Sequence, residues 1–216
     1  NEALAQDDFK PRALFERFNI EVLSTTESPI DDLAHHKAIL GSYWKGRVIS
    51  AYRPDNVVDA EHENFYNDLP IFGQLSGEDL GDFKSYLRAH QNRRAYFKST
   101  GVTSSDHGHP TAQTADLSGS EADALYQKIL AKKHDAKDAA LFRAQMLTEF
   151  AKMSIDDGLV LQIHAGAYRN HNKKLFDKYG RDKGGDHPSP TDYIHSLKPL
   201  LDRFGNEKSL SIILFT

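Results

Sequence analysis

The stretch Leu159-Val160-Leu161-Gln162-Ile163-His164-Ala165-Gly166 decides the fold class of this chain. It is a short run rich in Val, Ile and Leu that does not alternate cleanly between apolar and polar residues. Such runs are typical of parallel strands that are covered on both faces. Similar runs recur along the chain, and we predict strands at 20–24, 47–52, 102–105, 159–164 and 210–215.

Helical patterns fill the intervals between these strands. We predict helices over about 77–99 and 136–153, one capped by Ser118 or Ser120, and one that begins at Ser189 or Thr191 and ends at Gly205. Strands that alternate with helices indicate βαβ units and an α/β fold with a parallel sheet. Two connections are longer than a βα unit needs, so we expect helical excursions at about 64–100 and 118–158 within a single domain over 1–216.

The composition excludes several classes of function. The 216 residues are 39% hydrophobic and 27% charged, with a formal net charge of −4, which argues against nucleic acid as a partner. The chain has no cysteine, so disulfides and thiolate metal sites are excluded. No apolar run approaches the roughly 20 residues that cross a bilayer. We therefore expect a cytoplasmic protein without a membrane or nucleic-acid partner.

The two ends of the chain indicate an internal segment. Asn1 lies within a predicted helix, and Thr216 directly follows the apolar run Ile212-Ile213-Leu214-Phe215. We expect this sequence to be part of a larger domain.

Polar residues gather where the predicted strands end. Arg53-Pro54-Asp55 follows the second strand, Ser105-Asp106-His107-Gly108-His109 ends the third, and the fourth ends in His164. In parallel α/β folds, active sites lie at the carboxyl ends of the strands. The co-occurrence of these clusters therefore indicates a barrel-type active site.

Each cluster also has a structural alternative. Arg53 either binds an anionic group, which its guanidinium fork suits, or forms a turn with Asp55. Asp106 and His107 either carry chemistry or cap a helix. His164 is either a metal ligand or catalytic group, or a core histidine bonded to backbone.

The remaining basic residues are interpreted in the same way. Arg169 either positions a substrate or caps the next helix. His107 and His109 have the spacing of a metal-binding pair, but they lie in a Gly/Pro loop, so we do not interpret them as one. His35 and His36 point about 100° apart on a helix, cannot share one metal, and are interpreted as structural.

In this order, the clusters resemble the uronate isomerases. The matching stretches cover nearly the whole chain: Thr25-Thr26 with Pro29, Asp32-Leu33 with His35-His36, Arg53-Pro54-Asp55, Ser105-Asp106-His107, Gln162 with His164 and Gly166-Ala167, Arg169-Asn170, Phe176-Asp177, Tyr179-Gly180-Arg181-Asp182 and Leu197-Lys198-Pro199-Leu200-Leu201. The chain departs from the family at Glu27-Ser28, where two carboxylates are usual, and at Tyr168, where several relatives carry another residue.

The resemblance implies a fold and an activity. The fold is a partial TIM-type (β/α) barrel of the metal-dependent hydrolase kind, similar to the amidohydrolases, with about five parallel strands and extra helices. The activity is the interconversion of D-glucuronate with D-fructuronate and of D-galacturonate with D-tagaturonate. A divalent metal, expected to be zinc, and a uronate sugar are the implied ligands.

The resemblance and the strand-end clusters together assign the site. We assign substrate binding to Arg53 and Arg169, metal binding to His164, and catalysis to Asp106 and His107. The family's other metal ligands and its proposed base fall outside this sequence, so we expect the 216-residue segment to be inactive alone and the parent enzyme to be a homo-oligomer. The rival interpretations are an amidohydrolase-type metal hydrolase and a non-catalytic half-barrel module.

Overall fold

One parallel sheet organises the part of the chain that the structure, a computed structural model, describes, residues 2–181 and 183–215. Its strands are β1 (Val22–Glu27), β2 (Arg47–Tyr52), β3 (Ser104–His107), β4 (Val160–Ile163) and β7 (Ile212–Leu214), and their spatial order equals their sequence order. Each connection therefore moves to the next strand in the same direction, as in a (β/α) barrel, whereas a doubly wound sheet reverses direction. The predicted α/β class with five parallel strands is confirmed.

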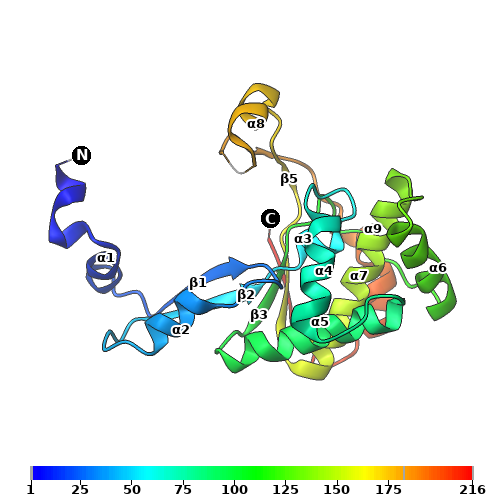
Figure 1. Ribbon diagram of the computed structural model, residues 1–216, viewed down its shortest axis with the longest axis horizontal. Helices are drawn as coiled ribbons and strands as arrows, with labels where there is room; N and C mark the ends of the chain where they lie inside the picture. The colour runs from blue at the N-terminus through cyan, green and yellow to red at the C-terminus, as the bar shows by residue number, and fades with distance from the viewer. Residues whose placement is uncertain (1, 182, 216) are drawn as a thin grey trace.

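The helices lie mostly to one side of this sheet (Figure 1). Figure 1 also shows the N-terminal segment extending away from them and α8 standing apart. The connections contain α2 (Ala34–Leu40), α3 (Asp55–Val58), α4 (Phe65–Ser76), α5 (Phe83–Ser99), α6 (Gly119–Leu130), α7 (Ala136–Asp157), β5 (Ala167–Tyr168), α8 (Lys173–Tyr179), β6 (His187–Pro188), α9 (Tyr193–Ser196) and α10 (Lys198–Phe204); η1 (Ala3–Ala5), η2 (Asp7–Phe9) and α1 (Pro11–Arg17) precede β1. Among the described helices, none is long and apolar enough to span a membrane.

Several predicted boundaries were wrong for local reasons. The helix predicted at 77–99 begins instead at Phe83, because Gly77, with a φ of 74°, ends α4 and Asp82 caps α5 by accepting from the Ser85 N–H. Asp192, rather than Ser189 or Thr191, caps α9. The first strand lies at 22–27, not 20–24. The helix predicted around Asn1 includes a residue outside those described. Thr216 and Asp182 also lie outside the described residues.

The third strand runs further than predicted, and this shift matters for the site. It covers Ser104–His107, not 102–105, so Asp106 and His107 belong to the ladder, where they pair with Gln162 and Ile163 of β4. Adjacent residues of a strand point to opposite faces of the sheet. Asp106 and His107 therefore lie on opposite faces.

The helix-covered face of the sheet holds the core. Tyr52 at the end of β2 is fully buried, with its ring centroid 5.1 Å from that of Phe97 on α5 and 6.5 Å from that of Phe150 on α7. The Tyr52 hydroxyl lies 2.7 Å from Nδ1 of His90. Burial lowers the pKa of His90 well below its ordinary value and raises that of the Tyr52 hydroxyl.

A buried ion pair joins two of these helices. Arg94 of α5 is fully buried, and its Nε and Nη2 donate to the two carboxylate oxygens of Asp157 on α7 at 2.7 Å and 3.0 Å. Nη2 of Arg94 also donates to Oγ of Ser154. This fork fixes the ends of α5 and α7 against each other.

Candidate functional site

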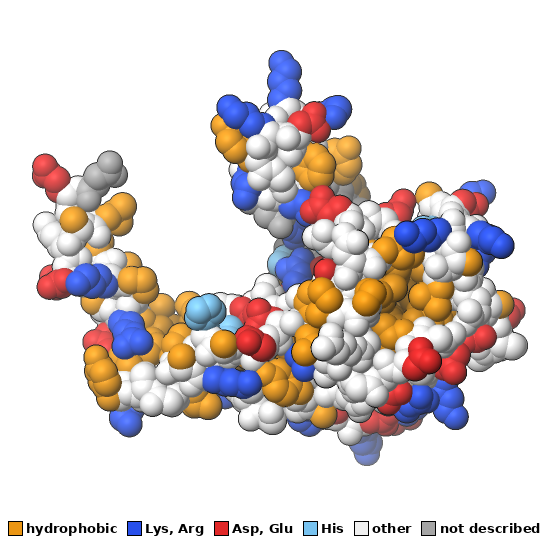
Figure 2. Space-filling model, viewed as in Figure 1, with side chains coloured by type: hydrophobic (Ala, Val, Ile, Leu, Met, Phe, Trp, Pro, Cys, Tyr) orange, Lys and Arg blue, Asp and Glu red, His pale blue; other side chains and the backbone are white. Residues whose placement is uncertain are grey.

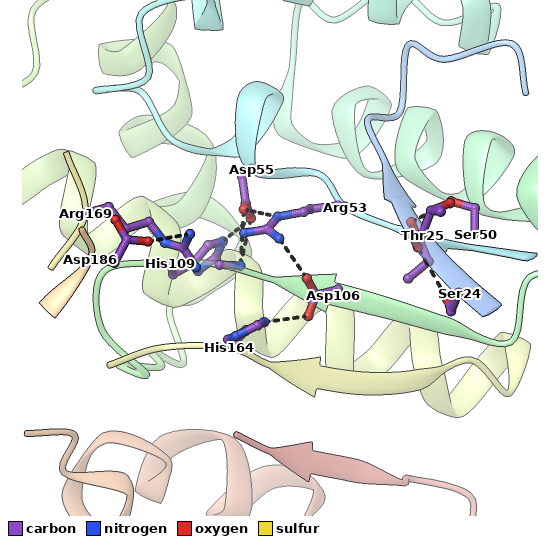
Figure 3. Close-up of polar contacts among 12 residues, drawn as sticks. Ser24, Thr25, Ser50, Arg53, Asp55, Asp106, His109, His164, Arg169 and Asp186 are labelled. Atoms are coloured by element: carbon purple, nitrogen blue, oxygen red, sulfur yellow. Dashed lines mark hydrogen bonds and ion pairs between the residues drawn. The ribbon is translucent and has the colours of Figure 1, made fainter. Parts of the chain in front are cut away.

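Three side chains from neighbouring strands form a polar row at the carboxyl end of the sheet (Figure 3). Arg53 follows β2, Asp106 lies on β3 and His164 follows β4. Nη1 of Arg53 lies 3.1 Å from Oδ2 of Asp106, and Nδ1 of His164 lies 3.6 Å from Oδ1 of the same carboxylate. Asp106 therefore connects a cation to an imidazole across three strands.

The carboxylate at the centre of this row is almost inaccessible to water. Asp106 is 3% exposed, and this burial raises its pKa, while the charges of Arg53 and His164 act in the opposite direction. A buried carboxylate needs paired charge or hydrogen bonds to remain ionised. Arg53 supplies that charge, so the two residues depend on each other.

Arg53 is held from a second side by the loop after β3. Its Nε donates to Oδ2 of Asp55 at 2.9 Å, and the Asp55 carboxylate accepts from the Gly108 N–H at 3.1 Å and 3.2 Å. A Cβ at Gly108 would clash with Nη2 of Arg53 and lie 2.8 Å from Oδ2 of Asp55. Glycine at position 108 is thus required for the guanidinium to lie flat against the loop.

Both residues that we predicted to bind substrate line one cleft of about 920 Å³. Arg53 enters it from the end of β2, and Arg169 from the segment after β5; the other charged lining residues are Asp55, Asp59, Glu61, Asp68 and Arg181. Nη1 of Arg169 lies 3.3 Å from Oδ2 of Asp186, and Nε of Arg181 lies 3.2 Å from Oε1 of Glu63. The cleft thus presents guanidinium groups from two separate segments to one volume.

His107 lies away from this cleft, against the helices. It is fully buried, its ring centroid is 4.6 Å from that of Phe150, and its Nε2 lies 3.1 Å from Oγ of Ser105. Burial is the main cause of its strongly lowered pKa, with the neighbouring His109 second. A catalytic role for His107 stays a prediction, and from this position the ring would act through its neighbours.

His109 lies near the Arg53–Asp55 pair and is almost fully buried. Its Nε2 is 3.8 Å from Oδ1 of Asp55, and burial lowers its pKa. The ring centroids of His107 and His109 are 5.7 Å apart. His109 therefore packs beneath the Arg53–Asp55 pair, although its sequence position is in a Gly/Pro loop.

His36 lies in a separate polar cluster near the end of β1. Its Nε2 is 2.9 Å from Oγ1 of Thr25 and 3.6 Å from Oε2 of Glu27, and Ser50 also donates to Glu27. Ser28, the second residue of the Glu27-Ser28 departure, donates to Oδ1 of Asn56 at 2.9 Å. Glu27 and Ser28 thus both keep polar partners within the chain.

His164, which we predicted to bind a metal ion, is partly exposed at the end of the polar row. Its side chain is 40% exposed, and its Nδ1 faces Asp106, which leaves Nε2 on the far side of the ring. An imidazole oriented by a carboxylate through one nitrogen is the common arrangement of a metal-ligating histidine. Among residues 2–181 and 183–215, no group of three or more His, Asp or Glu side chains is placed to hold a metal ion.

The fold and the site together define a class. A parallel sheet that grows by one strand at a time, with a polar cleft at its carboxyl end, is a (β/α)-barrel-type domain. The family model described as glucuronate isomerase matches residues 1–216. The chain belongs to the glucuronate isomerase family.

Individual relatives agree with this assignment. The chain is 63% identical over 215 residues to a uronate isomerase of Phenylobacterium zucineum and 59% identical over 214 residues to one of Xanthomonas campestris; these matches cover 100% and 99% of the chain, but 45% of each relative. It therefore spans less than half the length of the curated relatives that it matches.

Solved structures give the same result. The crystal structure of glucuronate isomerase from Caulobacter crescentus superimposes with a TM-score of 0.94 at 58% identity, over 100% of this chain and 45% of that one. The uronate isomerase from Thermotoga maritima has a TM-score of 0.87 at 26% identity, over 95% of this chain and 46% of that one. Neither rival interpretation, metal hydrolase or non-catalytic module, is favoured by these comparisons.

Proposed function

We propose that the protein containing this chain is a uronate isomerase that interconverts D-glucuronate with D-fructuronate and D-galacturonate with D-tagaturonate. The observation that carries the proposal is the polar row Arg53–Asp106–His164 beside a guanidinium-lined cleft, in a chain that matches the family over its whole length. The reaction moves a proton between C2 and C1 of the sugar through an enediol. It requires a base, an anchor for the sugar carboxylate and an electrophile for the developing oxyanion.

The guanidinium groups suit the anchoring step. A uronate carries its carboxylate at C6, far from the reacting carbons, and a guanidinium fork binds such a group with two parallel hydrogen bonds. Arg53 is already oriented by Asp55 and Asp106, so it binds the carboxylate without loss of side-chain freedom. Arg169 lines the same cleft and is the second candidate anchor.

Asp106 has two roles in this proposal. Its carboxylate holds Arg53 on one side and orients the His164 ring on the other. His164 would hold a divalent metal, expected to be zinc, through Nε2, and when bound the metal would supply the electrophile.

The proposal also covers the cellular location, the oligomeric state and the superfamily of the protein. We expect a cytoplasmic protein, because a chain without cysteine needs no oxidising compartment. We also expect a homo-oligomer and kinship with the amidohydrolases. The two edge strands carry exposed apolar side chains, since Leu23 on β1 is 42% exposed and Ile213 on β7 is 47% exposed. Such side chains support the covering of these edges by a second subunit or by another part of the longer protein.

Isomerase activity on D-glucuronate and D-galacturonate tests the proposal. A protein of the relatives' length that contains this chain should be active, and the 216-residue chain alone should be inactive. In the longer protein, Arg53→Lys keeps the charge but loses the fork, and we expect KM to rise about 10- to 100-fold, because one charge-assisted hydrogen bond contributes about 1.5–3 kcal/mol.

Arg203→Lys is the matched control for this substitution. Arg203 is on α10, pairs with Asp116 at 2.7 Å and does not line the cleft, so the kinetics should stay unchanged. If Arg53→Lys leaves KM unchanged on both sugars, Arg53 does not bind the substrate carboxylate. If the longer protein converts neither sugar, the proposed activity is wrong.

A further inference from the structure

A narrow excursion leaves the sheet after β4 (Figure 1). Its residues Ala167, Tyr168, Arg169, Asn170 and Arg181 line part of the cleft. Its two limbs pair as antiparallel β5 and β6, with Tyr168 opposite His187, and the Ser189 N–H closes the base by donating to the Gly166 carbonyl at 2.8 Å. Arg169 and Asp186 form an ion pair across the same limbs. The excursion therefore determines where Arg169 lies.

Two histidines meet just beyond this ladder. Nε2 of His171, on the outgoing limb, lies 3.0 Å from Nε2 of His187, on the returning limb, and the ring centroids are 4.1 Å apart. A head-on hydrogen bond between two imidazoles at this nitrogen separation would place the centroids about 5.3 Å apart. The rings are instead inclined side by side, so their nitrogens converge.

The nitrogen separation matches that of two ligands on one ion. With metal–nitrogen distances of about 2.0–2.1 Å and an angle between 90° and 110°, the two nitrogens lie about 2.9–3.4 Å apart. Rings that point straight at such an ion have centroids about 4.7 Å apart, so from the observed 4.1 Å the two rings need to turn slightly to bind it. Neutral imidazole suits Zn²⁺, Cu²⁺ and Ni²⁺.

We propose that His171 and His187 bind one divalent transition-metal ion, with water completing its coordination. The site lies on the excursion and is distinct from His164, which follows β4. Asp186 pairs with Arg169, so this cation of the excursion carries a compensating charge. A bound ion joins the two limbs and so orders the segment that presents Arg169 to the cleft.

Zn²⁺ titration with a count of bound metal tests the site without reference to activity. In full-chain protein carrying His164→Asn, which removes the other candidate ligand, we expect one equivalent of Zn²⁺ to bind. Adding His171→Asn or His187→Asn should weaken the binding at least tenfold. The double substitution should weaken Zn²⁺ binding no more than either single substitution, because each single substitution already leaves only one imidazole at the site.

His195→Asn is the matched control. His195 is an exposed surface histidine whose Nδ1 contacts Asp192 at 2.6 Å in its own turn, so its replacement should leave Zn²⁺ affinity unchanged. Trypsin cleavage after Lys183, which lies between the two histidines, should be slowed several-fold by Zn²⁺ and should not be slowed in His187→Asn.

Two results overturn the site. One is the absence of Zn²⁺ binding in the His164→Asn protein, which would mean that the pair is only a hydrogen bond between neutral rings. The other is equal Zn²⁺ affinity with and without His171→Asn and His187→Asn, which would place the ion elsewhere. Circular dichroism of each variant serves as the check that it remains folded.

Discussion

The buried Arg94–Asp157 ion pair should be among the most sensitive points of this chain to mutation. Arg94 is 0% exposed, and both of its bonds to the carboxylate are short, 2.7 Å and 3.0 Å. Asp157→Ala leaves the guanidinium buried without its partner. An uncompensated buried charge of this kind costs about 3–5 kcal/mol.

The position of Asp157 narrows this estimate. Its side chain is 24% exposed, so water reaches part of the space that the carboxylate vacates, and the lower end, about 3 kcal/mol, applies to the pair itself. The carboxylate also accepts from the Leu159 N–H at 2.9 Å, and losing that bond adds about 1 kcal/mol. We expect Asp157→Ala to lower the free energy of unfolding by about 3–4 kcal/mol.

Urea unfolding at neutral pH, with linear extrapolation, measures this difference. Asp156→Ala is the control, because Asp156 is the neighbouring helix residue. Its side chain is 51% exposed and pairs with Lys152 one turn away, so the substitution should lower the free energy of unfolding by at most about 0.5 kcal/mol. Arg94→Met should cost less than Asp157→Ala, because it removes the buried charge itself. If the two aspartate variants differ by less than about 1 kcal/mol, the reasoning about the buried charge is refuted.

Two further outcomes follow from the site and the core. Gly108→Ala should displace Arg53 and destabilise the protein by about 1–3 kcal/mol, and it should raise the KM of the longer protein for uronate about tenfold. Gly119→Ala is the control, because nothing lies within 4 Å of a Cβ at this position, and it should change neither quantity. Equal behaviour of the two variants would contradict the close packing of Arg53. Burial lowers the pKa of His90, His107 and His109, so these rings stay neutral in the folded state. In the unfolded chain, the same rings take up protons below the ordinary histidine pKa of about 6.5. The free energy of unfolding should therefore be constant above about pH 6.5 and should fall below it, by up to about 1.4 kcal/mol per pH unit for each histidine. Asp106 partly offsets this loss at lower pH, because a carboxyl group with a raised pKa in the folded state stabilises the fold as the pH falls. Urea midpoints that stay flat from about pH 7.5 to 5.5 would contradict this expectation.

The sequence predicted the sheet better than it predicted the site. Apolar runs located β2, β4 and β7, because a parallel strand that is covered on both faces is apolar over its own length. The observed β3, Ser104–His107, contains no apolar residue. The third strand was placed too early, since Asp106 and His107 look like loop residues locally. Only pairing with β4 shows that they belong to the ladder, and only the ladder shows that they face opposite ways.

The cleft shows the same division. Arg53 was a candidate from its place after a strand, and the structure puts it in one cleft with Arg169. Gly108 and Asp186 were not singled out as site residues, because a glycine in a polar loop and an acid in a charged segment carry no local signal. Their importance depends on which side chain lies against them.

By itself, the sequence determined the fold class and the family, because apolar periodicity and collinear motifs are properties of contiguous residues. Tertiary structure alone decided which polar residues meet. Arg94 finds Asp157 across 63 positions, Arg53 finds Asp106 across two strands, and His171 finds His187 across an antiparallel excursion. Such contacts depend on strand register and helix packing, which place distant segments side by side and which no local pattern encodes.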